Sequence, residues 1–410
     1  MRSTFRRLLV ITLCVLMCTG TVFASGFSIF EQGARAMGMS GAFAARANDL
    51  SAIFHNPAGL ANLYGTHVQF GTSLIGVGPE FVQAGTLIQA NAVDQTFFPS
   101  TVYIGTRFND RIVVAFGFYT PFGLGMKWNN DWIGKHIIKE INLQTFNLNP
   151  VIAYEVTDQL NVGVGFQYMH AKADISRYAA FLIPDATIEG DANGFGFNAG
   201  IQYEANEKVT FGFVYRSEIE LNVEGDATFT YAFNDPTSLA VMRSQYPNSK
   251  AKLDITLPAM MFFGINYRPT DKLSTEFDIN WTGWSSYKEL AIKFDDPLLD
   301  DSISPKNWNN VYNYRFGLEY YYSDTWTLRC GGYFDDSPVD DEYLEPILPD
   351  SDRNGLTFGL GWSQGNMFVD AAYLHIFAND RATTTSIVGF NGSYKNSSDL
   401  FGVTFGYRLN

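Results

Sequence analysis

The stretch FGVTFGYRL, residues 401–409, decides how the whole chain is interpreted. Apolar residues occupy every second position, and glycine, hydroxyl or charged residues occupy the positions between them. The apolar set is Phe401, Val403, Phe405, Tyr407 and Leu409, and the other set is Gly402, Thr404, Gly406 and Arg408. Because successive side chains of a β-strand point to opposite faces, this period of two predicts a strand with one apolar and one polar face.

The same alternation recurs along the chain. It is clear in residues 160–168, 194–203, 273–281 and 312–322, where the apolar face carries no charge. Such segments predict about fourteen strands. The predicted strands begin near residues 66, 98, 111, 143, 159, 193, 207, 251, 272, 309, 325, 354, 366 and 398.

The connections between these strands alternate between short and long. Short ones lie at 108–110, 155–158, 204–208, 268–271, 323–324 and 363–365. Long ones cover 77–97, 120–142, 172–192, 224–250, 291–308, 335–353 and 378–397. This order predicts an all-β, antiparallel up-and-down sheet with every short turn at one end, which is the pattern of a transmembrane β-barrel of the bacterial outer membrane.

The composition also favours a membrane barrel. The 410 residues are 46% hydrophobic and 16% aromatic but only 17% charged, below the ~25% of a typical soluble domain. A soluble periplasmic β-sandwich would show the same alternation and stays open as the alternative. Three features favour the barrel: many strands of about ten residues, strand ends rich in Tyr and Trp, and a second face rich in glycine and polar groups. Because hydrocarbon tolerates no open sheet edge, the sheet is expected to close.

Residues 1–24 have the features of a signal peptide. Three arginines precede the apolar run 8–18, and cleavage is predicted after Ala24. Two of the three cysteines lie in this segment, so the exported chain would keep Cys330 alone and form no internal disulfide. The whole sequence has a formal net charge of −14, and such an acidic balance disfavours nucleic-acid binding.

Residues 25–62 form a separate segment that does not alternate as a strand. Small and apolar residues dominate it, and it ends at Asn56, Pro57 and Ala58, where proline fixes a turn. A disordered periplasmic tail is one interpretation. A fourteen-stranded barrel, however, has a lumen too wide for its own side chains to fill. The favoured prediction is therefore a hatch of residues 25–62 that plugs a barrel of residues 63–410.

Several motifs resemble, in order and spacing, the FadL family of outer-membrane transporters for hydrophobic compounds. They are SGF at 25–27, NPA at 56–58, TPFGLG at 120–125, ADISRYA at 173–179, YRSE at 215–218, PTDKL at 269–273, FDDSP at 334–338 and LPDSDR at 348–353. The resemblance extends over most of the chain after residue 24. It implies a monomeric fourteen-stranded barrel, plugged by its N-terminal hatch, with both termini in the periplasm.

The resemblance also implies a route for the ligand. Family members take up long-chain fatty acids or, in some cases, aromatic hydrocarbons. The ligand first meets an apolar groove among the extracellular loops and then a pocket inside the barrel against the hatch. Movement of the hatch and an inward kink in the third strand are implied to release it sideways into the membrane.

Particular residues follow from the same resemblance. In fatty-acid members an interior Arg and a Lys meet the ligand carboxylate; Arg177 matches the Arg, and Lys306 is the nearest candidate for the Lys. Arginine suits this role because it pairs with carboxylates in two parallel hydrogen bonds. Two alternatives stay open: Arg177 pairs with Asp174 or Glu189, and Lys306 is a solvated loop residue.

Two further sets of site residues come from the motifs. The hatch motif is Asn56, Pro57 and Ala58, and the candidate strand kink is Pro121, Phe122, Gly123 and Gly125. For residues 121–125 the alternative to a functional kink is a plain loop.

Other chemistries find little support in the sequence. Acidic loop pairs such as Asp335-Asp336 could bind a divalent cation that bridges to anionic surface lipid, but none has the spacing of a defined ion loop. The five His residues lack ligand spacing, and no Ser/His/Asp grouping stands out. We expect no enzyme activity, cofactor or metal, and we expect outer-membrane lipid and lipopolysaccharide as surroundings.

The leading hypothesis is uptake of long-chain fatty acids or similar hydrophobic molecules. Uptake of neutral aromatic hydrocarbons is a second hypothesis, and it requires no interior cation. A general porin for polar solutes is a third, and a surface adhesin built on the long loops is a fourth. Steady conductance in a planar bilayer would indicate a porin, because a plugged transporter conducts little.

Overall fold

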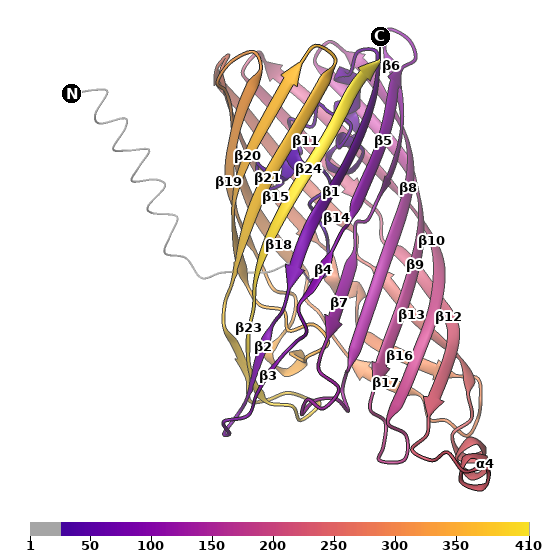
Figure 1. Cartoon of the computed structure of the whole chain (residues 1–410). Coiled ribbons are helices and arrows are strands. Elements are labelled where there is room, and N and C mark those ends of the chain that lie inside the picture. The colour runs from indigo at the N-terminus through magenta and orange to yellow at the C-terminus, as the bar shows by residue number, and fades with distance from the viewer. Residues whose placement is uncertain (1–25, 410) are drawn as a thin grey trace.

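A closed antiparallel barrel of 14 strands forms the body of the molecule (Figure 1). The computed structural model describes residues 26–409, so the predicted signal peptide of residues 1–24 lies outside the described part of the chain. Some wall strands are interrupted and carry two labels. The wall elements are β1 (Thr66–Val77), β4 (Gln95–Phe97), β5 (Ser100–Arg107), β6 (Ile112–Tyr119), β7 (Gly123–Lys127), β8 (Glu140–Thr157), β9 (Leu160–Arg177), β10 (Asp185–Asn206), β11 (Val209–Arg216), β12 (Ile219–Thr230), β13 (Ser249–Leu257), β14 (Met260–Thr270), β15 (Leu273–Thr282), β16 (Glu289–Phe294), β17 (Ser302–Pro305), β18 (Val311–Tyr321), β19 (Trp326–Asp335), β20 (Arg353–Gln364), β21 (Met367–Ala378) and β24 (Ser397–Leu409).

Closure of the barrel joins its first and last strands. β1 and β24 pair antiparallel from Thr66↔Leu409 to Ile75↔Leu400. Every wall strand therefore has hydrogen-bonding neighbours along most of its length, as a sheet surrounded by hydrocarbon requires. The predicted all-β barrel and its strand order are confirmed.

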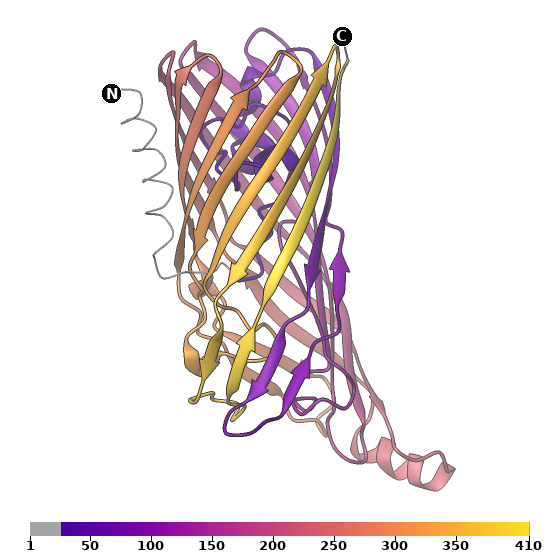
Figure 2. The same cartoon turned by 60° about the vertical axis from the view of Figure 1, so that its left-hand side comes forward.

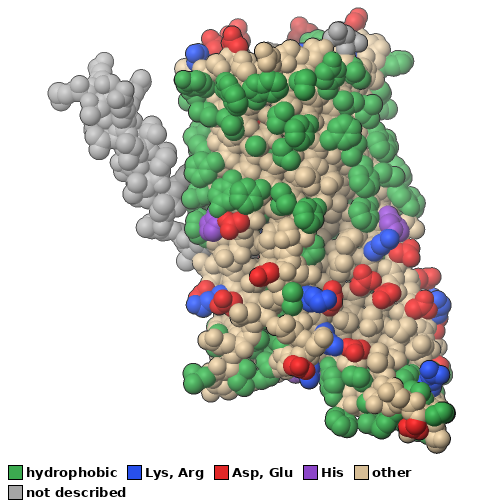
Figure 3. Space-filling model, in the orientation of Figure 1, with side chains coloured by type: hydrophobic (Ala, Val, Ile, Leu, Met, Phe, Trp, Pro, Cys, Tyr) green, Lys and Arg blue, Asp and Glu red, His purple; other side chains and the backbone are tan. Residues whose placement is uncertain are grey.

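The apolar faces point outward, as their period predicts. On β24, Phe405 is 55% exposed, whereas the neighbouring Thr404, which faces the lumen, is 1% exposed. Figure 3 shows apolar side chains gathered over the half of the barrel wall toward the C-terminal end, with most charged side chains beyond this band or at the rim. Exposed aromatic residues cluster near the short turns, as a girdle at a membrane interface requires; they include Tyr64, Tyr154, Tyr203, Tyr267, Tyr322, Trp326 and Tyr407.

The short turns all lie at one end of the barrel, and the long connections lie at the other (Figure 1). We call these the short-turn end and the long-loop end. The long connections contain more regular structure than the sequence predicts. The predicted loop 172–192 is mostly strand, since β9 continues to Arg177 and β10 begins at Asp185. Beyond the apolar band the outward-facing residues of these strands are polar, and apolar residues such as Ile175 and Ile188 face inward instead, so the outward apolar face that marks a membrane strand disappears although the pairing continues.

Regular elements also form within the other long connections. A separate four-stranded sheet pairs two distant connections and comprises β22 (Arg381–Thr383), β23 (Gly392–Lys395), β2 (Glu80–Gln83) and β3 (Gln89–Asn91). The remaining elements are α4 (Pro236–Gln245), η2 (Trp284–Ser286) and η3 (Asp341–Tyr343). Figure 2 shows α4 projecting sideways from the long-loop end. Every helix among residues 26–409 is too short or too polar to cross a membrane.

Residues 26–63 run inside the barrel (Figures 1 and 2). They contain α2 (Ala34–Met37), α3 (Ala52–His55) and η1 (Pro57–Asn62). Nearly all of these residues are buried, and hydrogen bonds connect them to wall strands on several sides of the lumen, for example from Asn198 Nδ2 to the Ile53 carbonyl at 3.0 Å. This packing accounts for a segment that is apolar without alternating.

Candidate functional site

An apolar cavity of about 640 Å³, which we call the outer groove, opens at the long-loop end. Strands β9, β10, β12, β16 and β17 and the neighbouring loops build it. Its apolar lining includes Ile175, Ile188, Phe229, Leu290, Ile292 and Ile347. Branched and aromatic side chains of this kind suit an alkyl chain or ring, because each buried CH₂ contributes about 0.8 kcal/mol.

Arg177 lies at the end of β9 and lines the outer groove. Its side chain is exposed and forms no ion pair with any residue from 26 to 409. The alternative in which Arg177 pairs with Asp174 or Glu189 is therefore not observed. A guanidinium without a carboxylate partner beside an apolar groove has the chemistry needed to hold the head group of an ionised amphiphile.

A small cavity of about 20 Å³, which we call the constriction, lies next to the outer groove. It shares Glu345 and Ile347 with that groove. Lys306 lines it but is only 2% exposed, so the interpretation of Lys306 as a solvated loop residue is wrong. The Lys306 ammonium instead pairs with Glu345 and lies 3.1 Å from Ser304 Oγ. Arg177 and Lys306 therefore line different cavities.

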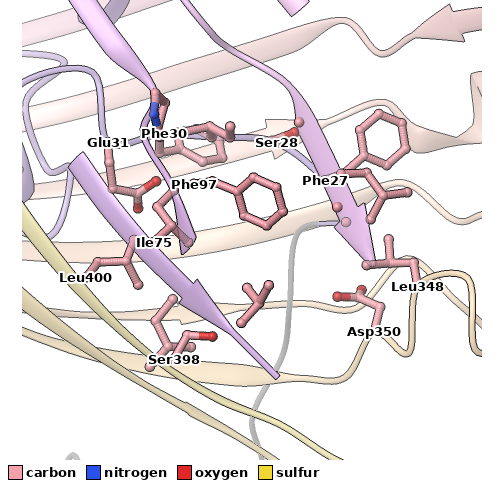
Figure 4. Close-up of a pocket in the computed structure, with 18 of the residues that line it drawn as sticks. Phe27, Ser28, Phe30, Glu31, Ile75, Phe97, Leu348, Asp350, Ser398 and Leu400 are labelled. Atoms are coloured by element: carbon pink, nitrogen blue, oxygen red, sulfur yellow. The ribbon is translucent and has the colours of Figure 1, made fainter. Parts of the chain in front are cut away.

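A third cavity, of about 320 Å³, lies between residues 26–31 and the barrel wall. We call it the inner cavity. It shares Phe27, Leu124 and Leu348 with the constriction, so the three cavities follow one another from the long-loop end into the lumen. Figure 4 shows its lining, in which Phe27 and Glu31 come from the segment inside the barrel, Ile75 and Phe97 from the wall, and Leu348 from a long connection.

Aromatic rings surround Phe27 where the constriction meets the inner cavity. The ring centroid of Phe27 lies 4.6 Å from that of Trp284, 5.8 Å from Trp308, 6.0 Å from Tyr287 and 6.2 Å from Phe122. Edge-to-face contacts of this kind are favourable beyond simple burial. Phe27 therefore fills a space that an apolar ring or chain end would also fill.

The predicted kink coincides with an interruption of the third wall strand. β6 ends at Tyr119 and β7 begins at Gly123. Within the interruption, the Pro121 carbonyl accepts a hydrogen bond from Ile29 N at 2.8 Å, and Gly123 N donates to the Phe27 carbonyl at 3.1 Å. Residues 27–29 thus pair with the wall where its own strand is broken.

The interruption also alters pairing across the wall. β5 pairs with β6 only as far as Val102↔Phe118, and β7, which contains Gly123 and Gly125, pairs with β8 alone. The inner cavity lies beside this unpaired edge, and its lining includes Phe98, which is 61% exposed. The wall beside the inner cavity therefore has fewer strand-to-strand hydrogen bonds here than elsewhere along β8.

Two carboxyl groups of the inner cavity are perturbed by burial. Burial raises the pKa of Glu31, against the opposing charges of Arg315 and Arg353. Burial likewise raises the pKa of Asp350, whose carboxylate accepts a hydrogen bond from Ser337 Oγ at 2.9 Å. These carboxyl groups therefore retain their protons to higher pH than exposed carboxyl groups do.

The motif residues Asn56, Pro57 and Ala58 are completely or almost completely buried inside the barrel. Asn56 Oδ1 accepts a hydrogen bond from Ala58 N at 3.1 Å, which caps the following η1 helix. Its Nδ2 donates to the Ala44 carbonyl at 2.7 Å and to the Ile201 carbonyl of β10 at 3.1 Å. Asn56 therefore connects two parts of the segment to the wall.

Buried ion pairs hold the same segment in place. Glu319 of β18 contacts Arg35 Nε at 2.9 Å and Arg46 Nη2 at 2.7 Å, both from the segment, and Arg329 Nε of β19 at 2.7 Å. Neither Glu319 nor Glu345 is among the site residues that the sequence predicts. For Glu319 the sequence offers one indication, because a charged Glu lies on the polar face of a predicted strand and would point into the lumen. No local sequence feature distinguishes Glu345 from the other acidic residues of the long loops.

Metal ligation has no support in the described residues. No three His, Cys, Asp or Glu side chains between residues 26 and 409 come together in a way that could hold a metal ion. Asp335, which the sequence predicts in a loop, is the last residue of β19 and is buried; it pairs with Arg315 at 3.1 Å and Arg353 at 3.5 Å.

The sequence and the fold are similar to those of known outer-membrane proteins. The chain is 26% identical to the long-chain fatty acid transport protein of Escherichia coli O6:H1 over 438 residues, which cover 97% of this chain and 98% of that protein. A crystal structure of a Pseudomonas aeruginosa FadL homologue superimposes with a TM-score of 0.83 at 21% identity, over 94% of this chain and all of that one. The Pseudomonas putida toluene transporter TodX superimposes with a TM-score of 0.76 at 15% identity, over 92% and 98%.

The family assignment rests on nearly the whole sequence. Residues 15–409 match the family described as "Outer membrane protein transport protein (OMPP1/FadL/TodX)". The members are transport proteins rather than enzymes, and they are located in the bacterial outer membrane. The barrel with its internal segment and three successive cavities is thus a member of the FadL family of outer-membrane transporters.

Proposed function

We propose that this protein takes up hydrophobic compounds through the outer membrane, with long-chain fatty acids as the leading ligands. The observation that carries the proposal is the succession of outer groove, constriction and inner cavity, which ends at the interrupted wall strand. A ligand would bind first in the groove, pass Phe27, and leave sideways at residues 120–125. The name of the E. coli relative supports the same ligand class.

The internal segment acts as the hatch in this scheme. Residues 25–62 plug a barrel of residues 63–410, after removal of a signal peptide of residues 1–24. Hydrogen bonds and ion pairs fix most of the hatch, including the Asn56, Pro57 and Ala58 motif, whereas residues 26–31 border the inner cavity. We propose that residues 26–31 and the kink residues Pro121, Phe122, Gly123 and Gly125 form the movable part of the route.

The orientation of the barrel in the membrane follows from the different lengths of the connections at its two ends. Outer-membrane barrels have short periplasmic turns and long extracellular loops. We therefore place the short-turn end and both termini in the periplasm, and the outer groove at the cell surface among lipopolysaccharide. Each barrel has its own cavities, so a monomer suffices for transport.

Replacing Arg177 with Ala should weaken the binding of a long-chain fatty acid by about threefold to tenfold. The reason is that an ionised head group would lose its cation at the groove while its chain keeps the apolar lining. Binding of radiolabelled oleate to the purified, detergent-folded protein measures the effect. Lys172→Ala is the matched control, since Lys172 lies on the same strand with an exposed side chain. Unchanged oleate affinity in Arg177→Ala would remove Arg177 from the binding site.

Aromatic hydrocarbons are the second candidate ligands. The rings around Phe27 favour them, and the similarity of the fold to the toluene transporter TodX is consistent with them. Toluene added to the same oleate-binding assay distinguishes the two candidates. Effective competition at low toluene concentration would favour an aromatic ligand, whereas its absence would favour fatty acids.

A further inference from the structure

A buried ion pair closes the constriction between the two larger cavities. The Lys306 ammonium contacts the Glu345 carboxylate, and the two side chains are 2% and 9% exposed. Tyr287, Trp308 and Val339 line the same small space. Within residues 26–409, Glu345 is the carboxylate that pairs with Lys306. The positive charge of Lys306 is therefore already neutralised before a ligand arrives.

The pair lies directly on the proposed route. Glu345 also lines the outer groove, and the constriction shares Phe27 and Leu124 with the inner cavity. The constriction holds about 20 Å³, which is space for about one water molecule. A ligand that moves from groove to inner cavity must displace side chains here and meet Lys306 and Glu345 as it passes.

An ionised ligand and an uncharged ligand meet different obstacles at this position. A carboxylate would bring a second negative charge to a single ammonium in apolar surroundings, or it would have to separate a buried pair; both are unfavourable. An alcohol, ester, hydrocarbon or protonated acid adds no charge and needs only the movement of side chains. Glu345 already occupies the position in which a ligand carboxylate would neutralise Lys306.

From this geometry we propose that Glu345 is the specificity-determining residue of the constriction. It neutralises Lys306 from within the protein, so the constriction lets hydrophobic compounds with an uncharged end pass and stops ionised carboxylates before they reach the inner cavity. An ionised fatty acid is held at Arg177 in the outer groove and passes further only in its protonated form. The inference rests on the proposed function and narrows its ligand class.

The test compares two ligands with the same chain, oleate and oleyl alcohol. Binding is measured at about pH 6, above the usual pKa of a carboxyl group and below the pKa of about 7 to which burial lowers Lys306, in an Arg177→Ala background that removes the groove cation. The background protein should bind the alcohol more tightly. Adding Glu345→Gln should strengthen oleate binding by roughly tenfold or more and should change alcohol binding much less. Adding Lys306→Met as well should abolish the gain.

The control variant is Glu342→Gln, because Glu342 is an exposed acid on the same long connection; it should change neither affinity. Folding of each variant is checked by its heat-modifiable migration on gels. An unchanged ratio of oleate to alcohol affinity in folded Glu345→Gln protein would overturn the role of Glu345 while leaving hydrophobic transport intact. Binding of neither ligand by any variant would overturn the proposed function and this inference together.

Discussion

Glu319→Ala should convert the closed barrel into an ion-conducting one. Glu319 holds Arg35 and Arg46 of the hatch and Arg329 of the wall in one buried cluster. Within residues 26–409, its removal leaves Asp49 as the carboxylate for Arg35, Asp370 for Arg329 and the Tyr321 hydroxyl as a partner of Arg46. Breaking a buried pair by removing one partner costs about 3–5 kcal/mol. The wall does not depend on this cluster for its strand pairing. The cost should therefore appear as release of the hatch, measured as steady conductance in planar bilayers.

The control for this prediction is Glu220→Ala. Glu220 lies on β12 with an exposed side chain that faces away from the lumen. This variant and the unmodified protein should both show little steady conductance. If Glu319→Ala folds and stays as closed as the control, the arginine cluster does not hold the hatch.

Gly200→Val should displace the hatch, because the added side chain would clash with it. Gly200 and Gly163 face each other on β10 and β9, beneath the Asn56–Pro57 peptide of the hatch. A Cβ at Gly200 would lie 2.1 Å from Asn56 Oδ1, and one at Gly163 would lie 2.3 Å from the Pro57 carbonyl carbon. Overpacking typically costs about 1–3 kcal/mol. The atoms nearest Gly200 belong to the Pro57 ring and to the Asn56 side chain, whose Oδ1 would lose its hydrogen bond from Ala58 N if it moved away. We expect increased conductance and faster proteolysis within residues 26–63.

Gly76→Val provides the matched control on another wall strand. Its nearest neighbour for an added Cβ is the Asp399 carbonyl oxygen, at an ordinary contact distance of 3.8 Å. The control should remain closed and protease-resistant. A closed, resistant Gly200→Val barrel would show that the hatch does not need its close approach to the wall.

The wall of the barrel could be predicted from the sequence because lipid and lumen impose opposite demands on alternate residues. Phe401, Phe405 and their equivalents must be apolar, while Thr404 faces a polar interior. The predicted strand at residue 193 shows where this signal fails. β10 begins eight residues earlier, at Asp185, since beyond the hydrocarbon the outward positions are polar and the alternate apolar residues, such as Ile188, face inward.

The candidate site could be predicted only in part. Arg177 and the segment 120–125 were found because local motifs resemble a family, and the structure brings them to the outer groove and the interrupted strand. Lys306 was found in the same way, but its neutralisation by Glu345 was not. The two residues are 39 positions apart, and their contact depends on how two long connections fold over the barrel. No local pattern encodes that arrangement.

The same limit applies to the hatch. Its apolar composition predicts burial, whereas its docking depends on partners that are distant in sequence. Arg35 and Glu319, for instance, are 284 residues apart. Such pairs follow from barrel register and hatch position together, so they become visible only in the assembled fold.

The central claim is that hydrophobic ligands pass through the lumen beside residues 26–31. Ser28 and Phe122 form an isolated antiparallel bridge between this segment and the interrupted strand, within the spacing that a disulfide can span. Ser28→Cys and Phe122→Cys, combined with Cys330→Ser, would cross-link the segment to the wall reversibly. Uptake of labelled oleate and oleyl alcohol by cells carrying this variant is the measurement. We predict that oxidation reduces uptake of both ligands to background and that a reductant restores it; unimpaired uptake by the fully cross-linked protein would contradict the claim.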